Sequence, residues 1–315
     1  MKAQIITCTH RVLELPALLE WNVVHTGGVP CDSFSVTFFY DASMAEPLHL
    51  AAGFTALENG EVMLRGIVDE YTVDLGTSGL TATVCGRGYA ARLLDNESRP
   101  MTYASATLEE ILRNHVTPYG ITAARIASVR ALSPYTVASG TSQWKALEGF
   151  CRAYGGFTPT FQRDGRLVAA PAGAGRRVRI DEGNAVLSCR LREDHYGVLT
   201  EVLVIDKTRN AFYSVKNNDM LSRGGQCRRV VCTPGQSTWD AIRYTGEYQI
   251  AQSAREELSI VLTLPGNFLA FPGDEVELSL ARMGLAGVYR VTQADNRFSL
   301  SGGATVELTL EKGGA

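Results

Sequence analysis

The sequence has no block of basic residues and no long apolar run. Its 30 Lys and Arg residues are dispersed among 33 Asp and Glu residues, for a formal net charge of −3. Tight binding to nucleic-acid phosphates needs clustered Lys and Arg, so we expect no specific nucleic-acid binding. Because no apolar run reaches about 18 residues, we also expect no stable membrane insertion. The first ten residues lack the apolar core of a signal peptide.

Patterns typical of catalytic and metal sites are scarce as well. The seven cysteines are odd in number and scattered, which predicts reduced thiols in a cytoplasm-like compartment. The five histidines show no zinc-ligand spacing, and Cys227 and Cys232 are interpreted as unpaired thiols. No Gly-x-Ser-x-Gly turn occurs. The sequence therefore predicts no catalytic residue, no cofactor and no metal.

Acidic residues are plentiful, but their clearest pairs are adjacent in the chain. Asp69-Glu70 and Asp181-Glu182 are two such pairs. Neighbours on a strand point to opposite faces, so these carboxylates cannot flank one glycosidic bond. Carboxylates that are distant in sequence can still meet in a folded chain. A hydrolase built from such residues therefore stays open as an alternative.

The most informative stretch covers residues 62–95, where two alternating runs are separated by Gly76-Thr77-Ser78-Gly79. In the first run, alternation places these residues on one strand face: Met63, Ile67, Tyr71 and Val73. In the second run, these residues share a face: Leu80, Ala82 and Val84. The pattern predicts a long β-hairpin, then a Gly-Arg-Gly kink and a short helical turn that ends at Asp95.

The segment after this hairpin also fits a dinucleotide-binding fingerprint, Gly86-Arg87-Gly88-Tyr89-Ala90-Ala91. That function requires a long helix within a parallel βαβ unit. Here the preceding strand belongs to a hairpin, and Arg99-Pro100 limits the following helix to about two turns. We interpret the glycines instead as permitting a sharp corner between strand and helix.

A similar layout returns near the C-terminus. Each copy has an acidic loop, a strand that starts with glycine and a Thr-rich return strand. The first copy comprises residues 54–63, 66–70 and 80–84, and the second comprises residues 271–278, 287–291 and 305–310. We interpret these as a degenerate internal repeat.

Between the two copies the sequence changes character. Thr107-x-x-Glu110 is a capping box, and Leu108, Ile111, Leu112 and His115 follow at helical spacing. We expect a second helix over residues 142–154 and a hairpin around Asp164-Gly165. Further along, residues 217–226 are polar and are expected to form a loop, and residues 244–258 are expected to form a helix.

The predicted fold class is α+β, mainly β, with two β-barrel domains in a degenerate repeat and a small α+β domain between them. The expected domains are residues 1–97 (first barrel), residues 98–175 (small α+β domain) and residues 176–315, which hold the second barrel and one helix.

The order of these motifs resembles that of phage baseplate hub proteins, namely the Mu-type tail hub and the late control protein D family. The resemblance rests on residues 64–70 and 84–95, then on residues 107–121 and 144–168, and finally on residues 254–266, 271–274 and 287–291. It implies that both barrels are of the tail-tube type. The signature positions of the two barrels are structural: Gly66, Asp69, Gly86, Gly88, Leu94, Asp95, Gly273, Asp274, Gly287 and Val291.

The resemblance further implies a structural protein of a contractile tail that is assembled in the host bacterial cytoplasm and located in the virion baseplate. Three copies would supply six barrels, and this ring would join a hexameric tail tube to a trimeric spike. The implied partners are other copies of the chain, the tail tube protein, the central spike protein and other baseplate proteins, with DNA passing through the bore. The alternatives are a tail-associated cell-wall hydrolase and the hub portion of a type VI secretion spike.

Overall fold

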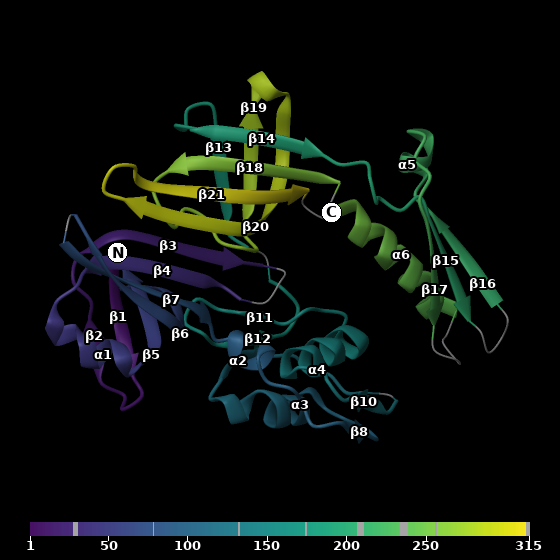
Figure 1. Cartoon of the computed structure of the whole chain (residues 1–315). Helices are drawn as coiled ribbons and strands as arrows, with labels where there is room; N and C mark the ends of the chain where they lie inside the picture. Colours follow the sequence, from purple (N-terminus) through teal and green to yellow (C-terminus); the bar gives the residue numbers. More distant parts are fainter. Residues whose placement is uncertain are drawn as a thin grey trace. The chain divides into compact units, whose positions relative to one another are not determined.

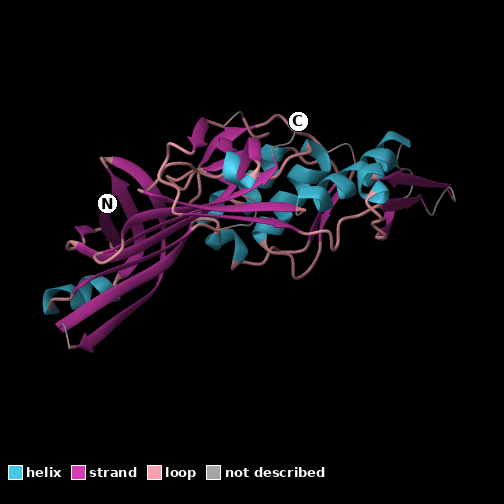
Figure 2. Cartoon of the chain, turned by 90° about the horizontal axis from the view of Figure 1, so that it is seen from above, coloured by secondary structure: helices cyan, strands magenta, loops and turns pink. Residues whose placement is uncertain are grey.

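The computed structural model describes residues 1–27, 31–77, 79–131, 133–173, 175–206, 211–233, 239–255 and 257–312. It is mainly β, as predicted, with large antiparallel sheets (Figure 2). The chain forms two compact units. Unit 1 holds residues 1–178, 264–274 and 291–307, and unit 2 holds residues 179–263, 275–290 and 308–315. No helix in the described segments has the length and hydropathy needed to cross a membrane.

Unit 1 contains an antiparallel sheet with the strand order β20–β3–β4–β7–β6–β5–β1–β2 (Figure 1). Its strands are β1 (Lys2–Thr7), β2 (Val12–Glu14), β3 (Leu18–Thr26), β4 (Ser33–Phe39), β5 (Ala51–Glu58), β6 (Glu61–Gly76), β7 (Gly79–Gly88) and residues 291–299 of β20 (Leu285–Ser299). Alternate residues of these strands face one apolar core, in which the rings of Phe34 and Phe54 stack with centroids 3.7 Å apart.

The predicted hairpin is present as β6 and β7, and Ala82 and Val84 share a buried face of β7. The kink expected at Gly86-Arg87-Gly88 was wrong, because these residues belong to β7 and pair with β6. The predicted face of the first run was wrong, because Asp69 forms a β-bulge. Val68 lies opposite Gly86, whereas Glu70 already lies opposite Cys85. This extra residue reverses the alternation, so that Ile67 and Tyr71 point to opposite faces of the strand.

The middle of the chain is a small α+β region that also belongs to unit 1. Its elements are α2 (Ala91–Leu94), β8 (Met101–Tyr103), α3 (Leu108–His115), η2 (Thr117–Tyr119), β9 (Ala123–Ile126), β10 (Tyr135–Val137), α4 (Gln143–Phe150), η3 (Cys151–Gly155), β11 (Thr160–Phe161) and β12 (Leu167–Ala169). The capping box of Thr107 and Glu110 is confirmed, and His115 is buried on the same face of α3 as Leu108, Ile111 and Leu112. The second helix ends at Phe150 and continues as a π turn, which Gly156 stops in the left-handed conformation.

Unit 2 contains a second set of paired strands and a helix-covered sheet. Its elements are most of β13 (Arg177–Asp181), β14 (Ser188–Glu193), β15 (Glu201–Asp206), β16 (Ala211–Lys216), α5 (Asn218–Ser222), β17 (Arg228–Thr233), α6 (Trp239–Arg255), most of β18 (Leu258–Pro265), β19 (Glu275–Leu280), η4 (Ala281–Met283) and parts of β20 and β21 (Gly303–Lys312). Helix α6 packs on β15 and β16, where Gly246 allows close approach of Val215. The loop predicted for residues 217–226 was wrong in part, because Asn217 caps the short helix α5.

Two sets of six strands repeat the same pairing in the same chain order. In the first set, β1 pairs with β5, β3 with β4, β4 with β7, β5 with β6, and β6 with β7. In the second set, β13 pairs with β19, β14 with β18, β18 with β21, β19 with β20, and β20 with β21. Five pairings therefore correspond one to one. The insertion β15–β17 with α6 falls between β14 and β18, at the place of the turn from β3 to β4.

The remaining short elements, η1 (Ala42–Met44) and α1 (Ala45–His49), lie between β4 and β5. The side chain of Asp41 caps η1, and Leu48 of α1 is buried in the core of the first strand set.

Candidate functional site

Arg87 connects two of the predicted signature residues. It lies on β7, and its Nε donates to the Asp69 carboxylate at 2.7 Å while its Nη2 donates to Asp95 at 2.8 Å. Asp69 is the bulged residue of β6, and Asp95 follows α2 directly. Hydrogen bonds from Arg87 lower the pKa of Asp95, and those to Asp69 and Asp95 raise the pKa of Arg87. The cluster therefore fixes the bulge, the return strand and the helical turn together.

The glycines around this cluster are required by close approach of the backbone. Gly66 lies directly opposite Gly88, and a Cβ atom at Gly66 would lie 2.2 Å from the carbonyl oxygen of Arg87. A Cβ atom at Gly86 would lie 2.0 Å from the carbonyl oxygen of Ile67. These contacts account for Gly66 and Gly86 without a nucleotide, whereas the nearest atom to a Cβ at Gly88 would lie at an ordinary 3.4 Å. Helix α2 has only four residues, too few for the long helix of a dinucleotide site.

The other signature residues lie in three separate places. Gly273 has φ +95°, and its N–H donates to the Val291 carbonyl at 2.9 Å, while the Val291 N–H donates to Asp274. The Asp274 carboxylate accepts the backbone N–H of Phe271 at 3.0 Å, which closes the turn. Gly287, in contrast, lies opposite Leu278 in unit 2 and takes no part in this turn. Leu94 is half-buried against the core of the α+β region.

Sequence reasoning missed Arg87 as the residue that holds the first cluster together. The signal was a single arginine between two glycines, preceded and followed by the aspartates that it binds. The sequence did not show that the three side chains meet, because the bulge at Asp69 brings its carboxylate to the face of Arg87.

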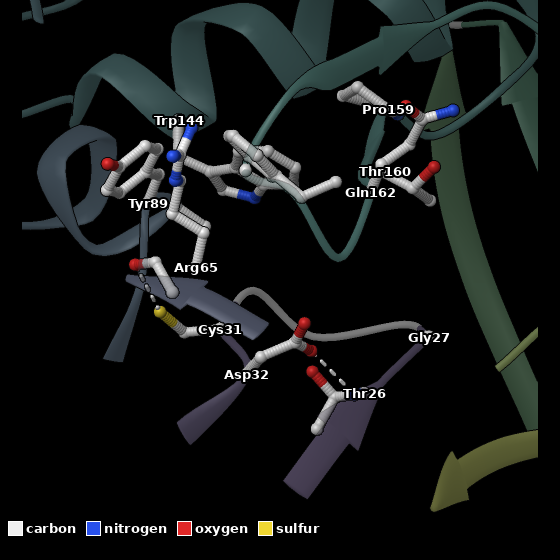
Figure 3. Close-up of a pocket in the computed structure, with 14 residues that line it drawn as sticks. Thr26, Gly27, Cys31, Asp32, Arg65, Tyr89, Trp144, Pro159, Thr160 and Gln162 are labelled. Atoms are coloured by element: carbon white, nitrogen blue, oxygen red, sulfur yellow. Dashed lines mark hydrogen bonds between the residues drawn. The ribbon is translucent and has the colours of Figure 1, made fainter. Parts of the chain in front are cut away.

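The cavity in Figure 3 lies within unit 1 and is small, at about 40 Å³. Thr26, Cys31 and Asp32 line one side of it, and Trp144 and Gln162 line the other. A volume of this size holds about one water molecule, whereas small-molecule sites span roughly 300–1,000 Å³. The cavity is therefore too small for a ligand of that size.

The acidic and thiol groups at this cavity are not poised for nucleophilic attack. The Asp32 carboxylate accepts the Thr26 N–H at 2.8 Å, and burial raises the pKa of Asp32. Burial also raises the pKa of Cys31 to about 11, so that its thiol stays protonated at neutral pH and donates to the Gly88 carbonyl. A second depression, of about 430 Å³, is open and polar, and its Asp164 is paired with Arg166 at 2.6 Å.

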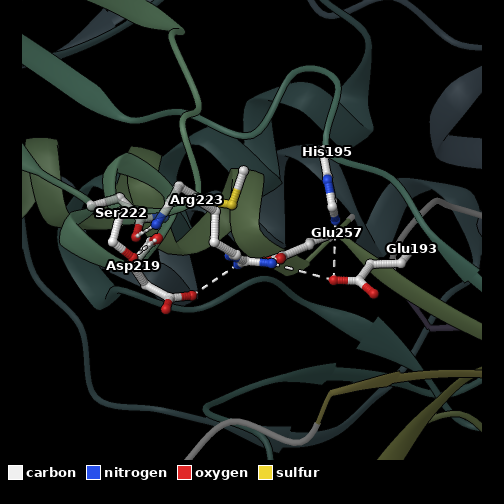
Figure 4. Close-up of polar contacts among 8 residues, drawn as sticks. Glu193, His195, Asp219, Ser222, Arg223 and Glu257 are labelled. Carbon is white, nitrogen blue, oxygen red and sulfur yellow. Dashed lines mark hydrogen bonds and ion pairs between the residues drawn. The ribbon is translucent and has the colours of Figure 1, made fainter.

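A cluster that sequence spacing did not reveal lies in unit 2 (Figure 4). Possible ligand atoms of Glu193, His195 and Glu257 lie within 4.8 Å of one another. Arg223 already binds both carboxylates, with Nη1 3.2 Å from Glu193 and Nη2 in contact with Glu257. Its pKa is raised, chiefly by the hydrogen bond to Glu257. A cation would compete with this guanidinium, so we interpret the cluster as an ion-pair network that links the end of β14, the residue after α5 and the residue before β18.

The adjacent carboxylate pairs of the sequence have separate roles. Asp69 is the unpaired residue of the bulge and binds Arg87. Glu70 follows the bulge and lies opposite Cys85 of β7. Asp181 accepts the backbone N–H of Gly183 at 2.9 Å, whereas Glu182 accepts that of Arg282 at 3.2 Å. Each of these contacts organises a turn or a strand end.

Comparison with solved structures identifies the fold. A tail protein from Neisseria meningitidis MC58 aligns with a TM-score of 0.79 and 15% identity, over 99% of this chain and 96% of that chain. The 43 kDa tail protein of prophage MuSo2 from Shewanella oneidensis gives 0.81 and 15%, over 98% and 97%. The E. coli c3393 protein, a type VI secretion component described as similar to the T4 tail proteins gp27 and gp5, gives 0.56 and 10%, over 94% and 74%.

These comparisons define the class of fold. The chain has the fold of phage tail proteins, which a component of the type VI secretion system shares, and the resemblance to baseplate hub proteins is confirmed at this level. No protein-family model and no curated protein matches the sequence.

Proposed function

We propose that this chain is a structural baseplate hub protein of a phage or phage-like contractile tail. The observation that carries the proposal is the double set of six strands, in which five pairings recur in the same chain order. A chain that presents the same strand set twice can match sixfold symmetry with three copies. The fold that it shares with phage tail proteins over nearly its whole length supports this role.

In this proposal each strand set forms one tube-type barrel, and three chains form a ring of six barrels. One side of the ring contacts the hexameric tail tube, the other contacts the trimeric spike, and further baseplate proteins surround it. The formal net charge of −3 suits a bore through which DNA passes without binding. The three-domain division at residues 97 and 175 and the structural role of the signature glycines and aspartates are parts of the same proposal.

Native mass measurement of the purified protein tests the ring directly. One chain has a mass of 34.1 kDa, so three copies give 3 × 34.1 = 102.3 kDa. We expect this mass, and a ring in electron micrographs of the isolated protein. A stable monomer that joins neither tube nor spike contradicts the proposal.

A second candidate is the hub portion of a type VI secretion spike, favoured by the shared fold of the E. coli type VI secretion component. That protein is matched over 74% of its length, whereas both phage tail proteins are matched over nearly all of theirs. Purification of the particle that contains this chain separates the two candidates. A phage or phage-like tail is recovered either attached to a capsid or as a free tail particle.

The hydrolase alternative has less support, because the carboxylates described above are engaged in turns and ion pairs. A peptidoglycan clearing assay tests it. We expect no clearing, and clearing that is lost on substitution of one Asp or Glu would favour the enzyme.

A further inference from the structure

We propose that copies of this chain join edge to edge: residues 69–76 of β6 in one copy pair antiparallel with β14 of the next copy. This inference rests on the proposed ring and specifies the contact that closes it. Both strands have one side without a partner in the described part of the chain, and their side chains are complementary in polarity and in charge.

The outer half of β6 is a long open edge. Strand β5 pairs with β6 only as far as Ile67, so beyond the bulge residues 70–76 have β7 as their sole strand partner among the described residues. This stretch, Asp69-Glu70-Tyr71-Thr72-Val73-Asp74-Leu75-Gly76, contains neither proline nor lysine, two residues with which edge strands prevent pairing.

The two faces of this edge differ. Tyr71, Val73 and Leu75 lie opposite Val84, Ala82 and Leu80, on the face that packs on the core. They are nevertheless 38%, 41% and 82% exposed. Glu70 and Asp74 lie on the other face, opposite Cys85 and Thr81. An alternating apolar strand with an open side is a template for another strand.

Strand β14 is the second open edge. It ends the strand order of unit 2, with β18 as its partner. Leu191 lies opposite the buried Ile260, so it belongs to the core face, yet it is 39% exposed. Arg190 and Arg192 lie on the opposite face, opposite Val261 and Ser259.

The two edges therefore match on both faces. Residues opposite each other in an antiparallel pair point to the same side, so pairing would bring Leu191 to the row of Tyr71, Val73 and Leu75. It would also bring Arg190 and Arg192 to the row of Glu70 and Asp74. Glu70, Asp74 and Arg190 have no ion-pair partner within the residues that the structure describes. Opposite charges in cross-strand positions favour pairing.

The chain already contains one joint of this kind. In the recurring strand order, β20 holds the place of β6, and β14 holds the place of β3. Residues 293–299 of β20 pair antiparallel with residues 20–26 of β3 inside unit 1. On the core face of this joint Trp21 stacks on Phe298, and on the other face Asn22 donates to Asp295. The proposed joint between copies repeats this arrangement.

Because β6 and β14 are different strands, the contact is head to tail, and it closes a ring when three copies meet. The test uses charge reversal on the full chain. One variant carries Glu70→Arg with Asp74→Arg, a second carries Arg190→Glu with Arg192→Glu, and a third carries all four substitutions. Glu61→Arg is the matched control, because Glu61 lies on the part of β6 that β5 already covers.

We expect the trimer of the wild type to be lost in the first and second variants and regained in the third, as measured by native mass. The Glu61→Arg control should assemble like the wild type. Circular dichroism of each variant checks that the monomer is folded. If both edge variants form trimers as readily as the wild type, the proposed joint is wrong, while the proposed hub function stands. A wild type that never forms a trimer overturns the proposed function and this joint with it.

Hydrogen exchange of backbone amides in the wild type tests the same joint without any substitution. On dilution from trimer to monomer, backbone amides in residues 69–76 and 188–193 should lose protection, because the open edges return to water. Equal exchange of these two segments in trimer and monomer also overturns the joint.

Discussion

The outer half of β20 and the outer half of β6 hold the same place in the repeated strand pairing but differ in what covers them. Both belong to a long hairpin whose return strand follows at once, β21 and β7. Residues 293–299 of β20 pair with β3, whereas residues 70–76 of β6 pair with β7 alone among the described strands. The proposed joint would account for the exposure of Tyr71 and Leu75, because β14 of the next copy would cover them as β3 covers β20.

The comparison predicts that substitutions in the covered part of the sheet reduce stability most. Phe54→Ala should lower the free energy of unfolding by about 3–5 kcal/mol, because Phe54 is fully buried and stacks on Phe34. Chemical denaturation of the monomer measures this. If Phe54→Ala lowers the unfolding free energy no more than a substitution at an exposed position does, the core of the first strand set is less tightly packed than its burial indicates.

Gly86→Ala should have the next largest effect. The new Cβ atom would lie 2.0 Å from the Ile67 carbonyl oxygen and 2.7 Å from the Phe34 ring, so β6 and β7 must separate. We expect a loss of roughly 1–3 kcal/mol in unfolding free energy. Gly76→Ala is the control, because the nearest atom to its Cβ would be 4.0 Å away. Equal thermal stability of the two variants would contradict the close approach at Gly86.

The sequence was sufficient for much of the fold because local signals agree with the tertiary structure. The capping box at Thr107 and the alternation of Leu80, Ala82 and Val84 both led to the observed elements. The bulge at Asp69 was not predictable, because nothing in Asp-Glu distinguishes a bulged residue from a paired one. The ion pairs of Arg87 depend on that bulge, so the cluster could not be found. Asn217 was interpreted as part of a loop although it is a favoured capping residue.

Loss of the Arg87 ion pairs should lower the unfolding free energy less than Phe54→Ala or Gly86→Ala does. The structural change should be confined to the bulge at Asp69, where the open edge of β6 begins. Arg87→Gln should reduce stability by under about 1 kcal/mol, because these side chains are partly exposed to water. The pKa of Asp95 is lowered in the folded state, so its contribution is present above the unfolded pKa and is lost as the pH falls through the folded value.

The wild type should therefore lose stability on acidification toward pH values below about 4, the usual pKa range of Asp, and Arg87→Gln should lose less. Thermal melts at several pH values and salt concentrations measure this. Arg113→Gln, on an exposed position of α3, is the control. If both variants show the same pH dependence as the wild type, Arg87 does not stabilise the carboxylate of Asp95.

Leu75→Ser should have the smallest effect on the stability of the monomer, but it should weaken assembly of the trimer. Leu75 is 82% exposed in the single chain, so its loss should change the unfolding free energy of the monomer by about 0.5 kcal/mol or less. In the assembled ring the same side chain would be covered by β14 of the next copy, so its loss should shift the equilibrium from trimer toward monomer. Sedimentation over a range of concentrations measures the shift. Phe212→Ser is the control, because Phe212 is 70% exposed on β16, which belongs to a different sheet from β6 and β14. If Leu75→Ser and Phe212→Ser assemble equally well, the open edge of β6 is not part of the contact between copies. The equivalent places of β6 and β20 in the strand pairing then have no role in assembly.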